Sequence, residues 1–175
     1  MSIKNTLLLS VAISTLSLGL PKNIQKKVDK EIKDTFKIET FQFNSKAIDE
    51  AVVKTLPSKF GKNNFFEIKK SDELLGYAYI SKAPSKAGQF DYLILLDQNL
   101  TILKAKVLVY REDYGGEIGS KRWLKQFIGK TQNDELRYRE NIVAISGATI
   151  SVRSMTTAVN DLLKSLKILH SKHIL

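Results

Sequence analysis

The spacing of apolar residues predicts helices at both ends of the chain. Residues 21–36 carry an apolar side chain at every fourth position, with lysines between them, which is typical of an amphipathic helix. The same period runs from Thr149 to about Leu169 and predicts the best helix of the chain. The residues expected on its buried face are Val152, Met155, Ala158 or Val159, Leu162, Leu166 and Leu169. A further helical pattern follows Asn44 or Ser45, either of which can cap it.

Between these helices the pattern becomes that of extended chain. Residues 65–70 and 74–82 read as two strands, and residues 90–96 and 101–111 read as a hairpin. Together they predict an antiparallel meander of about four strands, preceded by an extended stretch at 36–43. The expected fold class is therefore α+β: one domain, with an antiparallel or mixed sheet flanked by the N-terminal and C-terminal helices.

A short segment joins an apolar run to the start of the last helix. Residues 141–145 are expected to form a strand, which would turn at Gly147 into the helix that begins at Thr149. A strand that turns through glycine into a helix makes an anion site, because free N–H groups and the helix dipole face the ligand. The alternative is that Ser146 or Thr149 is only the N-cap of the helix.

The motif at this turn resembles that of a known family. It reads Ser146-Gly147-Ala148-Thr149-Ile150-Ser151. It resembles the S-G-A-T motif of the FMN-binding domain family, which includes the covalent-flavin subunits of the sodium-pumping NADH:quinone reductase and of the Rnf complex. There the threonine carries FMN through a phosphoester that a separate flavin transferase makes. The resemblance, strongest over residues 74–163, implies FMN as cofactor and Thr149 as its attachment point. The family usually has aspartate where this chain has Val143, so non-covalent FMN binding stays an alternative.

A glycine-rich loop precedes this motif in the sequence. Residues 111–119 contain three glycines, more than a simple turn needs. In the family a loop at this place lies against the flavin ring, which makes Tyr114, Gly115 and Gly116 candidate contacts. A short helical pattern follows, with a buried stripe expected at Trp123, Leu124, Phe127 and Ile128. We interpret Tyr114 and Trp123 as candidate walls of the flavin site.

The N-terminal residues resemble a targeting segment. Lys4 precedes an uncharged run, Thr6 to Leu20, which is short for a bilayer span of about 20 residues. A basic residue followed by a short apolar run is the secretory signal pattern, and cleavage after Gly19 fits it. An uncleaved membrane anchor is the alternative.

Residues 1–20 are thus expected to be a signal peptide or anchor and residues 21–175 the FMN-binding domain. The expected location is periplasmic, or membrane-associated on the outer side of the cytoplasmic membrane.

Composition limits the remaining chemistry. The chain has no cysteine, which excludes disulfides, iron–sulfur clusters and zinc–thiolate sites. Its two histidines, His170 and His173, are too few to predict a metal site and lie too near the C-terminus to suggest a catalytic triad. The net charge of +10 attracts anionic partners in general.

Taken with the resemblance, these features predict an electron-transfer protein rather than a free-standing enzyme. The expected partners are a flavin transferase and redox proteins or a membrane electron-transfer complex, and no nucleic acid. The alternative from another class is a cofactor-free basic module that binds surfaces and uses the S-G-A-T turn as a plain helix cap.

Overall fold

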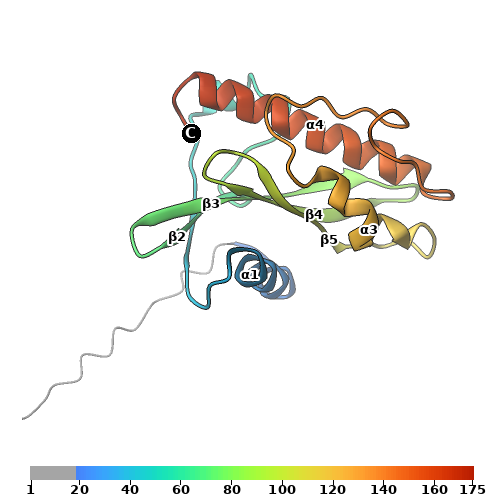
Figure 1. The fold of residues 1–175 in the computed structure, drawn as a ribbon, viewed down its shortest axis with the longest axis horizontal. Coiled ribbons are helices and arrows are strands. Elements are labelled where there is room, and N and C mark those ends of the chain that lie inside the picture. Colours follow the sequence, from blue (N-terminus) through green and yellow to red (C-terminus); the bar gives the residue numbers. More distant parts are fainter. Residues whose placement is uncertain (1–18) are drawn as a thin grey trace, which may run out of the picture.

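The computed structural model describes residues 19–175, so the predicted signal segment lies almost wholly outside the described residues. A five-stranded sheet lies between two long helices, α1 on one face and α4 on the other (Figure 1). In chain order the elements are α1 (Lys22–Phe36), β1 (Gln42–Ser45), α2 (Glu50–Val53), β2 (Phe65–Lys70), β3 (Glu73–Pro84), β4 (Gln89–Asp97), β5 (Ile102–Val109), the 3-10 helix η1 (Gly116–Gly119), α3 (Lys121–Leu124), the 3-10 helix η2 (Lys125–Phe127) and α4 (Thr149–Ser171). The predicted α+β class is confirmed. Among the helices of residues 19–175, none is long and apolar enough to span a membrane.

The sheet is an antiparallel meander in the order β1-β2-β3-β4-β5. Side chains alternate between its two faces, so Tyr77 and Tyr79 of β3 face the α4 side while Ala78 and Ile80 face the α1 side. Strand β4 is buried from Phe90 through Leu96, because helices cover both faces of the sheet there. This double burial explains why its sequence is almost continuously apolar.

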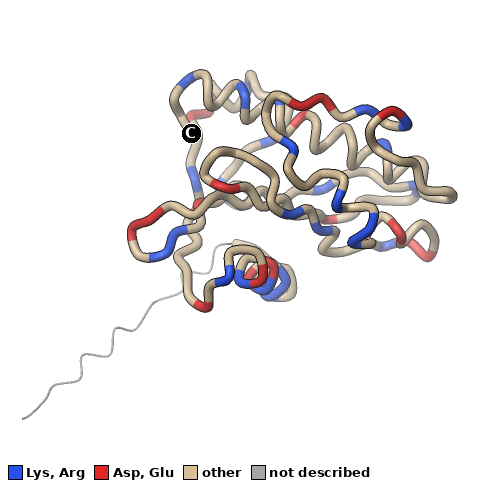
Figure 2. The backbone as a smooth tube through the Cα atoms, viewed as in Figure 1, with Lys and Arg blue, Asp and Glu red and all other residues tan. Residues whose placement is uncertain are grey.

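Helix α1 covers one face of the sheet through its apolar stripe. Ile24, Val28 and Ile32 are buried against residues of β2, β3, β4 and β5. On its outer side the helix carries lysines and acidic residues. Over the whole molecule, Figure 2 shows basic residues spread over many elements rather than gathered in one block. The amphipathic helix predicted for residues 21–36 is confirmed, and it docks on the protein's own sheet.

Helix α4 covers the opposite face and supplies much of the larger core. The expected inward residues are buried, with Val159 rather than Ala158 in the fully buried position; the set is Val152, Met155, Val159, Leu162, Leu166 and Leu169. Ser165 is also fully buried, and its hydroxyl accepts a hydrogen bond of 2.9 Å from the backbone N–H of Ser58. This bond ties the chain before β2 to the middle of α4.

Three predictions of secondary structure are wrong. Residues 141–145 form no strand: Ile142 makes an isolated bridge with Tyr138, and the rest is irregular. The second helix shrinks to Glu50–Val53 and is capped by the Asp49 side chain, because Asn44 and Ser45 pair with β2 instead. Ile128 follows the short helix and is 49% exposed, since the chain becomes extended there.

Candidate functional site

Helix α4 begins at Thr149 without a side-chain cap. Its N-cap residue is Ala148, whose methyl group accepts no hydrogen bond, and the first turn contains no acidic residue. The interpretation of Ser146 or Thr149 as a plain N-cap is therefore wrong. Thr149 is exposed. Because it is the first residue of a 23-residue helix, its hydroxyl lies at the positive end of the helix dipole, beside free backbone N–H donors. This arrangement suits a covalently or non-covalently bound anion.

The turn before the helix presents some of its residues to solvent and buries others. Ser146, Gly147, Thr149 and Ile150 are exposed. Ala148 and Ser151 are 4% and 2% exposed, respectively, and the Ser151 hydroxyl lies 3.1 Å from the phenol oxygen of Tyr110. Ala148 and Ser151 anchor the turn to the domain, while the exposed residues are accessible to a ligand.

The glycine-rich loop lies directly against this turn. Gly115 has a φ of +80°, and a Cβ at this position would lie 3.0 Å from the Cβ of Ala148 and 3.1 Å from the Tyr110 hydroxyl. Glycine therefore allows the loop backbone to touch the turn. The start of α4 and the loop before α3 lie at the same end of the molecule (Figure 1). Two of the predicted site segments thus come together in space.

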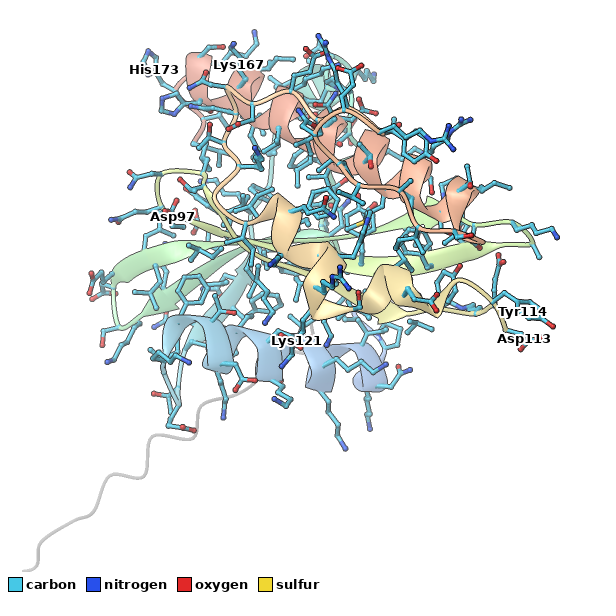
Figure 3. All side chains as sticks on the ribbon, turned by 45° about the vertical axis from the view of Figure 1, so that its right-hand side comes forward. Asp97, Asp113, Tyr114, Lys121, Lys167 and His173 are labelled. Carbon is cyan, nitrogen blue, oxygen red and sulfur yellow. The ribbon has the colours of Figure 1, made fainter. Side chains whose placement is uncertain are left out.

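The two aromatic residues predicted as flavin walls are placed differently. Tyr114 is 83% exposed and projects from the tip of the loop (Figure 3). Trp123 is 5% exposed, packs edge-on against Phe127, and donates its indole N–H to the carbonyl oxygen of Val143 at 2.8 Å. Tyr114 can offer a ring face to a ligand, whereas Trp123 mainly positions the segment that leads to Ser146.

Gln126 completes this support of Val143, a role that the sequence analysis missed. Its side-chain oxygen accepts the Val143 backbone N–H at 2.8 Å, and its side-chain amide donates to the Trp123 carbonyl oxygen at 2.8 Å. The peptide groups on both sides of Val143 are thereby held, while its side chain is 67% exposed. The position where the family usually has aspartate therefore faces outward on a fixed backbone.

A cluster of polar side chains beside Thr149 was also missed. The Tyr138 hydroxyl oxygen is buried and has no hydrogen-bond partner among the described residues. The guanidinium carbons of Arg139 and Arg153 lie 5.3 Å and 4.9 Å, respectively, from the centre of the Tyr138 ring, within range of cation–π attraction. Burial acts to raise the pKa of Tyr138, but the nearby Thr149 hydroxyl and the two arginines outweigh it and lower that pKa.

Comparison with known families bears directly on this end of the molecule. Residues 86–164 match the model of the FMN-binding domain family. This segment is an FMN-binding domain. It runs from the β3–β4 turn through the glycine-rich loop and the S-G-A-T turn into α4, so it contains every predicted site residue. None of the curated proteins matches the chain.

The residues of the FMN-binding domain fit its cofactor. FMN has a phosphate and a large flat ring, and it supplies reversible one- and two-electron transfer when bound. The buried Tyr138 hydroxyl without a partner and the uncapped start of α4 suit the phosphate. Tyr114, Val143 and Ile150 are among the large apolar side chains that are at least half exposed, and they belong to the loop, the turn and the helix start. Such apolar surface suits the ring.

Proposed function

We propose that this protein is an exported electron-transfer protein that carries FMN on Thr149 through a phosphoester. The observation that carries the proposal is the hydroxyl of Thr149, an exposed residue at an uncapped helix start inside the FMN-binding domain. A phosphate there gains about 0.3–1 kcal/mol from the helix dipole, too little to retain FMN alone. A covalent bond supplies the retention that the exposed site lacks.

The position of the site supports a role in electron transfer. A flavin at this end of the molecule would lie near the surface, since most of the turn and the tip of the loop are exposed. Exchange of electrons with another protein needs such access. The proposed partners are a flavin transferase for maturation and a redox protein or membrane electron-transfer complex outside the cytoplasm. Cell fractionation tests export, and flavin-loaded protein confined to the cytoplasm would contradict it.

The attachment is tested by producing the protein together with a flavin transferase. Mass spectrometry of the peptide Ser146–Arg153 should show FMN on Thr149, and Thr149→Val should lose the flavin after acid precipitation. Thr157→Val is the matched control, because Thr157 is an exposed threonine on the same helix. A colourless wild-type protein would refute the FMN function.

The same experiment distinguishes covalent from non-covalent binding, and a variant at Val143 tests the reason for the outcome. A yellow protein with an unmodified peptide would leave only non-covalent FMN. Val143→Asp should then restore attachment if the transferase reads that position. The substitution is tolerable because the Val143 side chain is 67% exposed and its backbone is held by Trp123 and Gln126.

A further inference from the structure

Arg139 and Arg153 have no carboxylate partner among residues 19–175. By contrast, Arg111 pairs with Asp91, and Arg137 pairs with Glu135 and Glu140. Two unpaired guanidinium groups on one tyrosine ring repel each other, and an anion between or beside them would remove that cost. The cluster therefore carries positive charge that no carboxylate of residues 19–175 neutralises.

Separate segments bring these side chains to Thr149. Arg153 lies one helical turn after Thr149 on α4, and helical side chains lean toward the N-terminus, so it reaches back along the same face. Arg139 comes from the preceding loop and has a φ of +65°. That conformation is uncommon for a residue with a side chain, and here the Arg139 backbone N–H donates to Ile142 at 2.9 Å.

The loop that carries Arg139 is held by its own hydrogen bonds. The Asn141 side chain accepts from the Arg137 backbone N–H at 2.7 Å and donates to the Glu135 carbonyl oxygen at 2.8 Å. The Ile142 bridge to Tyr138 closes the loop. The backbone at Arg139 and Tyr138 is thus held before any ligand arrives, so little ordering of the backbone is needed on binding.

We propose that Arg139, Arg153 and the Tyr138 hydroxyl bind the phosphate group of FMN beside Thr149. The inference rests on the proposed function and extends it to the groups that recognise the phosphate. Guanidinium groups form strong charge-assisted hydrogen bonds with phosphate oxygens. The phenol supplies a donor that has no other partner among the described residues. These three side chains would hold the phosphate beside Thr149 and favour FMN over riboflavin, which lacks the phosphate.

The test uses full-length protein prepared without flavin and titrated with FMN and with riboflavin. Wild type should bind FMN more tightly than riboflavin. In the double variant Arg139→Gln, Arg153→Gln the affinity for FMN should fall about 10- to 100-fold, whereas riboflavin binding should stay the same. Tyr138→Phe should lose about 3- to 10-fold for FMN alone.

The matched control is Lys167→Gln, Lys172→Gln, which removes two positive charges from exposed positions at the end of α4 opposite Thr149; Lys167 lies far from Tyr114 in Figure 3. It should keep the wild-type preference for FMN. An equal fall in this control would reduce the effect to net charge and overturn the inference. An unchanged FMN preference in the Arg139, Arg153 variant would also overturn it, while FMN binding itself would stand.

Inorganic phosphate gives a second readout that needs no flavin. At equal ionic strength, phosphate should raise the melting temperature of wild type above its value in chloride, and the Arg139, Arg153 variant should lose this difference. Equal melting temperatures of wild type in both salts would contradict the site. Phosphate stabilisation in a protein that binds neither flavin would refute the FMN function, and with it the assignment of this site to FMN.

Discussion

Three glycines near the candidate site have different physical roles. Gly115 combines a positive φ with close contact to Ala148 and Tyr110. Gly147 has a φ of +77° but open space where a Cβ would stand. Gly116 has neither a positive φ nor a close contact at that position. The three positions therefore separate the effect of backbone strain from the effect of packing.

Alanine substitutions at these positions should differ in a defined order. Gly147→Ala should lower the free energy of unfolding by about 1–2 kcal/mol, the cost of a side chain in the left-handed region. Gly115→Ala should cost more, because its Cβ also meets Ala148. Gly116→Ala should stay within about 0.5 kcal/mol of wild type. Chemical denaturation measures all three, and equal losses at Gly115 and Gly147 would show that the loop contact is weak.

At the scale of the element, α4 links the site to the core. Its first turn carries Thr149, while its middle holds Ser165, which is fully buried. The Ser165 hydroxyl accepts from the Ser58 backbone N–H at 2.9 Å and donates to the Asp161 carbonyl oxygen at 2.7 Å. The helix is thereby fixed along its axis as well as by its apolar face, so the start of α4 keeps its place against the loop.

Removing the Ser165 hydroxyl should weaken this link. Ser165→Ala leaves the buried N–H of Ser58 without a partner and should cost about 1–3 kcal/mol of stability. Ser171→Ala is the control on the same helix, because Ser171 is exposed and its hydroxyl only donates back to Ile168. Thermal unfolding of both variants measures the difference. Equal stability changes in both variants would contradict the role of the buried bond, because alanine favours a helix over serine at either position.

At the scale of the whole molecule, buried tyrosines couple stability to alkaline pH. Burial raises the pKa of Tyr77, Tyr79 and Tyr92 above the ordinary value of 10.0. The native state therefore keeps these protons at a pH where the unfolded chain loses them. Their contribution to stability is complete below pH 10 and is lost as the pH rises above it.

We expect the free energy of unfolding to fall steeply above about pH 10. Tyr92→Phe should make that decline shallower by about 1.4 kcal/mol per pH unit, because one group no longer ionises in the unfolded chain. Tyr114→Phe, at an 83% exposed position, is the control and should keep the wild-type slope. Urea unfolding at a series of pH values provides the measurement, and parallel curves for wild type and Tyr92→Phe would contradict the role of Tyr92.

Sequence alone was sufficient where local pattern and chemistry agree. The periods of α1 and α4, the strands at 65–70 and 90–96, and the S-G-A-T turn at the start of α4 were all predictable. Each depends on the spacing of a few neighbouring residues, which the chain carries in its order. The FMN-binding family could be recognised for the same reason, since its motif is contiguous.

Tertiary structure decided what depends on contacts between distant segments. The run at 141–145 has strand-like composition but no neighbouring strand to pair with, and Trp123 and Gln126 hold it instead. Tyr138 and Arg139 lie in a polar loop that reads as a surface connection, yet the fold brings them to Arg153 and Thr149. Nothing in the local spacing encodes that convergence, because it arises from the packing of α4 and its preceding loop against the sheet.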